Sequence, residues 1–200
     1  MIKNRIKKTA KKLLGRSKGK VMLNVGCGTD YKKGWINIDN NSDNNIKKLD
    51  LNWDLRNPLP YDEGSVDFIF NEHLIEHLTP EEGQVVIKDL MRVLKPGGVL
   101  RMATPNLAEV VEQYGSLPID KDPTIKRFKL TYIKTRAERI NIAFREWGHK
   151  WLYDTEELQR RIEEAGYKKI AFCKLRESTY PELRNLEIRE ESNLIAEVTK

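Results

Sequence analysis

The stretch Val21-Met-Leu-Asn-Val-Gly-Cys-Gly-Thr-Asp30, followed by Trp35-Ile-Asn-Ile-Asp39, decides the fold of this chain. Its first residues form a short apolar run without a helical stripe, which is typical of a central parallel strand covered on both faces. Gly26 and Gly28 then let the main chain adopt angles closed to other residues and approach a ligand closely. Open α/β sheets bind ligands just past the carboxyl ends of such strands, so the sequence predicts a ligand site at this turn.

The spacing of the glycines argues against the two commonest nucleotide-binding loops. A dinucleotide fingerprint needs a glycine where this chain has Tyr31, and an acidic residue about 20 positions later, whereas Asp39 comes much sooner. The triphosphate-binding pattern G-x-x-x-x-G-K-[ST] does not occur in the sequence. Asp30 in the loop instead suits a cofactor whose near end is a zwitterion or a cation, and S-adenosylmethionine has both features.

The rest of the chain alternates helix and strand patterns. Thr79-Pro-Glu-Glu82 predicts the start of a helix and Pro96-Gly-Gly98 its end. The acidic run from Asp154 to Glu157 predicts a second helix start. Residues 167–175 and 194–199 are typical of closing strands. This alternation predicts an α/β fold with a doubly wound, mostly parallel sheet.

Several motifs follow one another in a characteristic order. They are Leu23 to Gly28, Asp39, Asp54-Leu55 with Leu59-Pro60-Tyr61, Ser65 to His73 with Glu76-His77-Leu78, and Leu94 to Leu100. In this order they resemble the class I S-adenosylmethionine-dependent methyltransferases, most closely a small bacterial and archaeal group often associated with surface-polysaccharide genes. The resemblance implies the seven-stranded methyltransferase fold, with residues 21–200 as a single domain and residues 107–150 as a helical lid insertion that selects the methyl acceptor.

The same resemblance implies S-adenosylmethionine as the cofactor, held at the carboxyl edge of the sheet. The implied cofactor-binding residues are Gly26, Cys27, Gly28, Asp39, Asp54, Leu55 and Asn71, with Asp39 accepting hydrogen bonds from the ribose hydroxyls and the Asp54 segment running past the adenine. Asp50 lies on the same segment and could exchange roles with Asp54. The gap from Gly28 to Asp39 is too short for the helix usual in this family, so we expect a loop or a single turn there.

His149 and His73 are the candidate catalytic residues. His149 could take a proton from an acceptor hydroxyl, because the pKa of histidine lies near operating pH, or it could tie the insertion to the sheet by a hydrogen bond. His73 directly follows the fourth strand, where relatives face the transferable methyl group. We expect His77 to pack or to anchor a helix, and Glu72 either to assist or to face solvent. Cys27 is expected to be a small filler rather than a nucleophile.

Cysteine usage and charge bound the remaining possibilities. The two cysteines form no disulfide framework and no metal-ligand spacing, so the sequence predicts no metal site. Residues 1–20 hold nine of the 36 basic residues and no acid, and predict a basic amphipathic leader helix with Ile2, Ile6, Leu13 and Leu14 on one side. That helix could pack on the core, lie on an anionic membrane surface or contact RNA phosphates.

These patterns predict a methyltransferase that O-methylates a small molecule or a glycan sugar. The alternatives are a non-catalytic scaffold that binds S-adenosylmethionine, or an RNA methyltransferase that uses the basic leader. Asn71-Glu-His-Leu74 replaces the Asn/Asp-Pro-Pro-Tyr/Phe motif of nucleic-acid amino-methyltransferases, which argues against that activity. No apolar stretch approaches the roughly 18 residues of a membrane span, and no signal-like apolar region follows the basic start. We therefore expect a cytoplasmic protein, with the inner face of the membrane as an alternative location.

Overall fold

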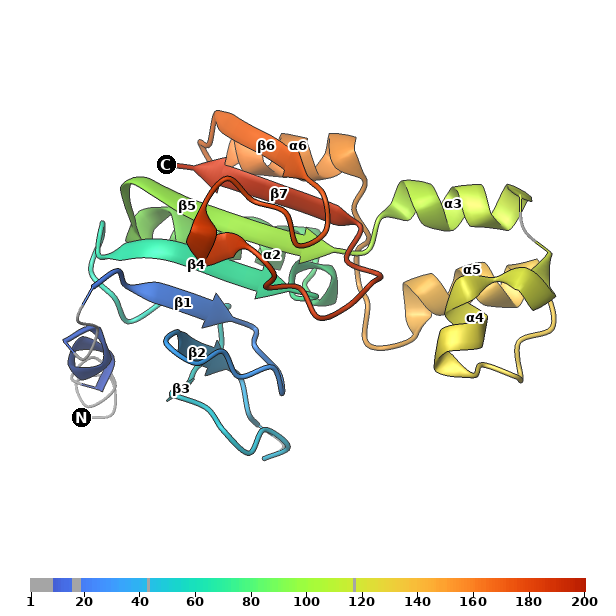
Figure 1. Cartoon of the computed structure of the whole chain (residues 1–200), viewed down its shortest axis with the longest axis horizontal. Coiled ribbons are helices and arrows are strands. Elements are labelled where there is room, and N and C mark those ends of the chain that lie inside the picture. The colour runs from blue at the N-terminus through green and yellow to red at the C-terminus, as the bar shows by residue number, and fades with distance from the viewer. Residues whose placement is uncertain (1–8, 16–18, 43, 117) are drawn as a thin grey trace.

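The computed structural model describes residues 9–15, 19–42, 44–116 and 118–200, which form a seven-stranded sheet with helices (Figure 1). The strands are β1 (Met22–Val25), β2 (Ile36–Asp39), β3 (Leu51–Asn52), β4 (Val66–Glu72), β5 (Leu94–Thr104), β6 (Lys169–Cys173) and β7 (Leu194–Thr199). Their order is β3-β2-β1-β4-β5-β7-β6, with β1 to β5 parallel and β7 antiparallel to both its neighbours. This topology confirms the predicted mostly parallel sheet.

Two helices, α2 (Pro80–Val93) and α6 (Thr155–Glu164), begin at the signals read from the sequence, whereas α2 ends at Val93 and the predicted stop at Pro96 to Gly98 lies within β5. Further helices are α3 (Leu107–Ser116), α4 (Pro123–Phe128) and α5 (Arg136–Arg145), with short 3-10 turns η1 (Ile75–His77), η2 (Ile119–Lys121) and η3 (Pro181–Leu183). At the start of α2, the Thr79 hydroxyl accepts the Glu82 N–H while the Glu82 carboxylate accepts the Thr79 N–H. At the start of α6, the Asp154 carboxylate accepts the Glu157 N–H. The chain from Gly28 to the start of β2 contains no helix, as expected from its length.

The sheet separates two clusters of buried apolar side chains. The larger cluster lies under α2 and α6, which contribute Leu90 and Ile162 among others. On the other face, Phe70 of β4 packs with Leu183 and Leu186 from the segment between β6 and β7. That segment crosses the sheet in front of β4 and β5 in Figure 1, so an irregular segment with one 3-10 turn covers this part of the sheet.

The described part of the N-terminal segment packs against the protein core. Residues 9–14 are helical, Ala10 is fully buried, and Leu13 and Leu14 contact the main cluster. Ile2 and Ile6 lie outside the described residues. In the described ranges of the chain, no helix has the length and apolar character needed to cross a membrane.

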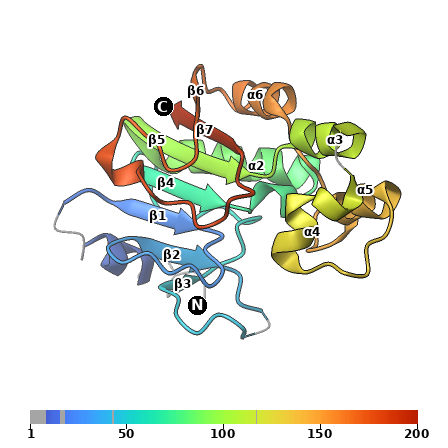
Figure 2. The ribbon, with the colours of Figure 1, turned by 45° about the vertical axis from the view of Figure 1, so that its right-hand side comes forward.

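Residues 107–150 form a separate helical unit beyond the carboxyl ends of β4 and β5, where α3, α4 and α5 gather (Figures 1 and 2). This unit has its own small cluster of Leu130, Ile133 and Ile142. A buried ion pair joins Arg139 of α5 to Asp122, which caps α4, at 2.9 Å. The predicted insertion is thus helical and holds together by its own contacts.

Arg101 lies at the centre of a buried ionic cluster. Its guanidinium on β5 donates to the carboxylates of Glu187 and Glu197 and to the Glu177 carbonyl, and the Arg101 side chain is fully buried. These bonds fasten the segment that covers the second face of the sheet to β5 and β7.

We predict that Arg101→Ala destabilises the protein strongly, because it leaves two buried carboxylates without their cation. The expected loss is about 3–5 kcal/mol in the free energy of unfolding, measured by urea denaturation. Arg160→Ala is the matched control, since Arg160 pairs with Glu157 and Glu164 on the surface of α6 and should lose less than about 1 kcal/mol. Equal losses in the two variants would contradict the assignment.

Candidate functional site

The glycine turn after β1 and the carboxylate that ends β2 are held together. The Gly26 and Cys27 N–H groups donate to the Ile38 carbonyl, and the Gly28 N–H donates to the Asp39 carboxylate at 2.6 Å. The sequence predicted that this turn and Asp39 belong to one cofactor site. The structure brings them into direct contact at the carboxyl edge of the sheet.

Gly26 and Gly28 both have positive φ angles, +66° and +51°, which only glycine adopts readily. Their surroundings differ. A Cβ on Gly26 would lie 2.7 Å from the Leu74 side chain, whereas a Cβ on Gly28 would meet nothing within 4 Å. Gly26 therefore lets Leu74 pack against the turn, and Gly28 leaves open space beside Asp39.

Cys27 and Asn71 are both buried at this edge but differ in chemistry. Burial and the negative charge of Asp39 raise the pKa of Cys27 to about 12, so its thiol stays protonated. A protonated thiol is a poor nucleophile. Asn71, at the end of β4, is fully buried, and neither its amide nitrogen nor its amide oxygen has a protein hydrogen-bond partner. Such an orphaned amide suits the polar groups of a ligand, since an unpaired buried polar group is costly.

Asp54 and Asp50 lie at opposite ends of β3. Asp50 precedes the strand and accepts hydrogen bonds from the Asn37 N–H and the Tyr31 hydroxyl. Asp54 follows the strand, and hydrogen bonds from Arg56 hold its pKa below the usual value. Leu55 is buried in the main cluster. Asp54, and not Asp50, therefore lies at the carboxyl edge of the sheet, where the glycine turn is found.

His73 and Glu76 meet just after β4. His73 has a φ of +52°, a left-handed conformation that is unusual for a residue with a Cβ, and its N–H donates to the Ala103 carbonyl. Glu76 in η1 is fully buried, with one carboxylate oxygen accepting the Thr104 hydroxyl at 3.0 Å and the other 3.2 Å from His73 Nδ1. The backbone turn thus aims the imidazole at the buried carboxylate.

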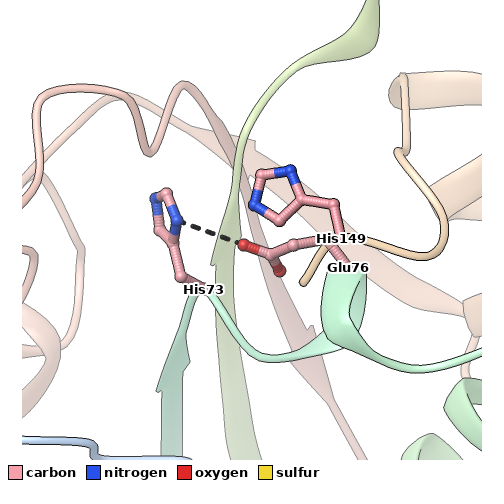
Figure 3. Close-up of side chains that lie close together, drawn as sticks. All are labelled: His73, Glu76 and His149. Atoms are coloured by element: carbon pink, nitrogen blue, oxygen red, sulfur yellow. Dashed lines mark ion pairs between the residues drawn. The ribbon is translucent and has the colours of Figure 1, made fainter. Parts of the chain in front are cut away.

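His149 comes to the same point from the other end of the insertion (Figure 3). The Lys150 and Trp151 N–H groups donate to the Glu76 carbonyl, at 2.7 and 3.2 Å, and so dock this loop on η1. His149 Nδ1 lies 2.7 Å from the Ala143 carbonyl, which can only accept a hydrogen bond. Nδ1 therefore carries a proton, and in the neutral ring the lone pair is on Nε2. The backbone beside His149 ties the insertion to the sheet, while the His149 imidazole reaches His73 and Glu76.

The surroundings of His73, Glu76 and His77 favour the neutral forms of these three side chains. Burial, together with the positive charge of Arg189, lowers the pKa of His73 to about 3. Burial raises the pKa of Glu76 to about 7. His77 stands edge-on to His149, with 5.1 Å between ring centroids, and burial and His149 lower its pKa as well. At neutral pH the His73 and His77 rings are therefore uncharged and keep a nitrogen lone pair.

A cavity of about 440 Å³ opens beside the histidines, between the ends of β4 and β5 and the helices α3 to α5. Its lining includes His73, His77, His149, Asn106, Phe128, Arg139, Trp147 and Arg189. The predicted catalytic residues thus face this cavity, whereas Gly26, Gly28 and Asp39 lie outside its lining. The two parts of the site meet through Leu74, which packs on Gly26 and follows His73 in sequence.

Glu72 does not take part in this cavity. Its buried carboxylate accepts the Ile188 and Arg189 N–H groups and the Ser192 hydroxyl, so it anchors the chain before β7. This contradicts a solvent-facing Glu72. Sequence reasoning also gave Glu76 no role of its own, although its spacing of three residues from His73, one helical turn, was a usable signal.

Comparison with known proteins gives the class of the domain. Residues 23–102, from β1 into β5, match the family model described as a methyltransferase domain. This part of the chain is similar to a methyltransferase domain. A relative from Mycolicibacterium smegmatis, the "Probable S-adenosylmethionine-dependent methyltransferase", is 31% identical over 109 residues, which are 48% of this chain and 42% of the relative. The match thus spans less than half of that protein's length.

Solved structures agree on the fold over the whole chain. A SAM-dependent methyltransferase from Archaeoglobus fulgidus matches with a TM-score of 0.54 and 16% identity, over 99% of this chain and 94% of the other. One from Thermotoga maritima matches with a TM-score of 0.52 and 15% identity, over 100% and 92%. These likenesses show that the chain has the class I methyltransferase fold.

The different surroundings of the two glycines generate a prediction. Gly26→Ala should lose about 2–5 kcal/mol in the free energy of unfolding, since it adds a clash with Leu74 to the cost of the left-handed backbone. Gly28→Ala should lose only the backbone part, about 1–2 kcal/mol. Urea denaturation of both variants measures the difference. Leu74→Ala in the Gly26→Ala background should recover the steric part, and a lack of recovery would refute the close contact.

Proposed function

We propose that this chain transfers a methyl group from S-adenosylmethionine to a hydroxyl of a small molecule or a glycan sugar. The observation that carries the proposal is the junction of two sites at the carboxyl edge of the sheet. The glycine turn bonded to Asp39 lies on one side, and a cavity lined by His73 and His149 lies on the other. Leu74 joins them, so a donor and an acceptor would meet near the end of β4.

The residues at the cofactor edge fit S-adenosylmethionine in kind. The Asp39 carboxylate suits the two ribose hydroxyls, the open space beside Gly28 admits the backbone approach of a ligand, and the orphaned Asn71 amide suits its polar groups. Asp54 would supply a polar contact beyond β3 for the adenine, whereas Leu55 is buried in the main cluster. The bound cofactor would supply an electrophilic methyl group on a sulfonium, and the protein's part is to align the acceptor with it.

The cavity supports an acceptor of moderate size. Its volume of about 440 Å³ falls within the range of small-molecule sites, roughly 300–1,000 Å³. Phe128 and Trp147 lie side by side in its wall, with ring centroids 5.7 Å apart, and the polar side chains of Asn106 and Arg189 share the lining. Flat apolar surfaces next to polar groups suit the two kinds of surface that a sugar presents.

His149 is the proposed proton acceptor in this reaction. Its Nδ1–H is held by the Ala143 carbonyl, which leaves Nε2 free to take the proton of an acceptor hydroxyl as the methyl group is transferred. His73 is proposed to orient the acceptor from the opposite side, because the two rings line one cavity and converge on Glu76.

We expect Asp39→Ala to weaken binding of S-adenosylhomocysteine roughly 10- to 100-fold, because two hydrogen bonds to a charged group are lost. Isothermal titration calorimetry measures this affinity. Asp39→Asn, which keeps an oxygen for the Gly28 N–H, guards against a loss caused by the turn alone. Asp62→Ala, on an exposed loop, is the control and should bind normally. Unchanged binding in both Asp39 variants would refute the cofactor site.

We expect labelled methyl from S-adenosylmethionine to enter the glycan or small-molecule fraction of an extract of the source cells. His149→Ala should slow this transfer at least about 100-fold while its affinity for S-adenosylhomocysteine stays unchanged. Lys150→Ala is the matched neighbour, since its side chain pairs with Glu82 on the surface and only its backbone docks the loop. Label in RNA would overturn the acceptor class, and cofactor binding without any label would favour a non-catalytic scaffold.

A further inference from the structure

The side chains of His73, Glu76 and His149 form a compact set of metal-ligating groups at the inner end of the cavity. One ligand atom from each lies within 4.8 Å of the others. Figure 3 shows the three side chains converging from the end of β4, from η1 and from the loop before α6. We propose that these three residues bind a divalent transition-metal ion.

The geometry needs little adjustment to accept an ion. Imidazole nitrogen and carboxylate oxygen bind such ions at about 2.0–2.2 Å, so that neighbouring ligand atoms lie roughly 3–3.5 Å apart. His73 Nδ1 and one Glu76 oxygen already lie 3.2 Å apart. To complete the site, the His149 ring would have to move closer to these two atoms. His149 lies on a loop at the cavity wall and is only partly buried.

The partners behind Glu76 and His149 also match those of a metal site. Metal-bound histidines usually donate their second ring N–H to a carbonyl or carboxylate, and metal-bound carboxylates usually accept a further hydrogen bond. His149 Nδ1 faces the Ala143 carbonyl, and the second Glu76 oxygen accepts the Thr104 hydroxyl. These contacts fix the ring and the carboxylate with their remaining ligand atoms turned to the common centre.

Glu76 and His73 also contain buried polar atoms that the protein leaves unpaired. One Glu76 oxygen and His73 Nε2 are inaccessible to solvent and have no hydrogen-bond partner, although this Glu76 oxygen lies 3.2 Å from His73 Nδ1. Within the described ranges of the chain, no lysine or arginine forms an ion pair with Glu76, although its side chain is fully buried. A buried carboxylate without a cation is costly, and a bound divalent ion would compensate it.

The ligand types select the ion. Two imidazoles and one carboxylate suit Zn²⁺, Co²⁺, Mn²⁺ or Fe²⁺, whereas Mg²⁺ and Ca²⁺ prefer oxygen ligands alone. Three protein ligands leave coordination positions open, and His73 and His149 both face the cavity. The site would therefore present an ion to whatever enters the cavity. This inference goes beyond the proposed methyl transfer, and His149 Nε2 can bind the ion or accept a proton but not both at once.

The test is a titration of the EDTA-treated and dialysed full chain with Co²⁺ and Zn²⁺. We expect one ion per chain and a visible Co²⁺ spectrum without the thiolate charge-transfer band that Cys27 or Cys173 would give. Glu76→Gln and His149→Ala should each weaken binding at least about 10-fold. Glu164→Gln, an exposed carboxylate on α6, is the matched control and should bind as the unmodified chain does.

Thermal unfolding checks that the variants are folded and gives a second readout. Zn²⁺ should raise the unfolding midpoint of the unmodified chain and of Glu164→Gln, but not that of Glu76→Gln or His149→Ala. Absence of binding by the unmodified chain, or equal binding by all variants, would overturn the inference. S-adenosylhomocysteine binding measured in EDTA tests the cofactor site separately, so failure of one proposal leaves the other standing.

Discussion

Docking of the insertion on Glu76 is the interaction on which the candidate site depends. The Glu76 carbonyl accepts two N–H groups from residues 150–151, and its carboxylate contacts both His73 and the Thr104 hydroxyl. A single buried residue after β4 thus joins the helical unit to the sheet and positions the cluster. The helical unit also contacts the segment before β7, through Glu109 with Asn193 and Arg127 with Glu191. The carbonyl contact is the one that holds the loop of His149 beside His73.

Parallel pairing of the strands sets where this can happen. Because β1, β2, β4 and β5 run in one direction, their carboxyl ends share one edge, and the residues that follow each strand converge there. The left-handed φ angles of Gly26 and His73 turn the chain sharply at that edge. The Arg101 cluster serves a different purpose, since it fastens the covering segment between β6 and β7 rather than the edge.

Much of the fold could be predicted from local signals in the sequence, whereas the grouping of His73, Glu76 and His149 could not. Short-range capping hydrogen bonds mark the start of α2, at Thr79 and Glu82, and of α6, at Asp154. The sequence is therefore sufficient to place the starts of these two helices. The contact between Glu76 and His149 spans a helical unit of its own, and no periodicity encodes that distance. The prediction of no metal site rested on cysteine spacing, which carries no information on two histidines and a carboxylate that only folding brings together.

Several buried polar side-chain atoms without hydrogen-bond partners lie close together in sequence at the carboxyl end of β4. Those of Asn71, His73 and Glu76 all follow one another at the end of β4 and in η1, while the rest of β4 is paired along its length to β1 and β5. Buried polar groups are normally satisfied, so a run of unsatisfied ones at a single strand end indicates partners from outside the chain. His73, in the middle of this run, lines the cavity, and Asn71 precedes it on β4. Under the two proposals, the same short stretch of backbone would offer groups to a cofactor and to an ion at the end of β4.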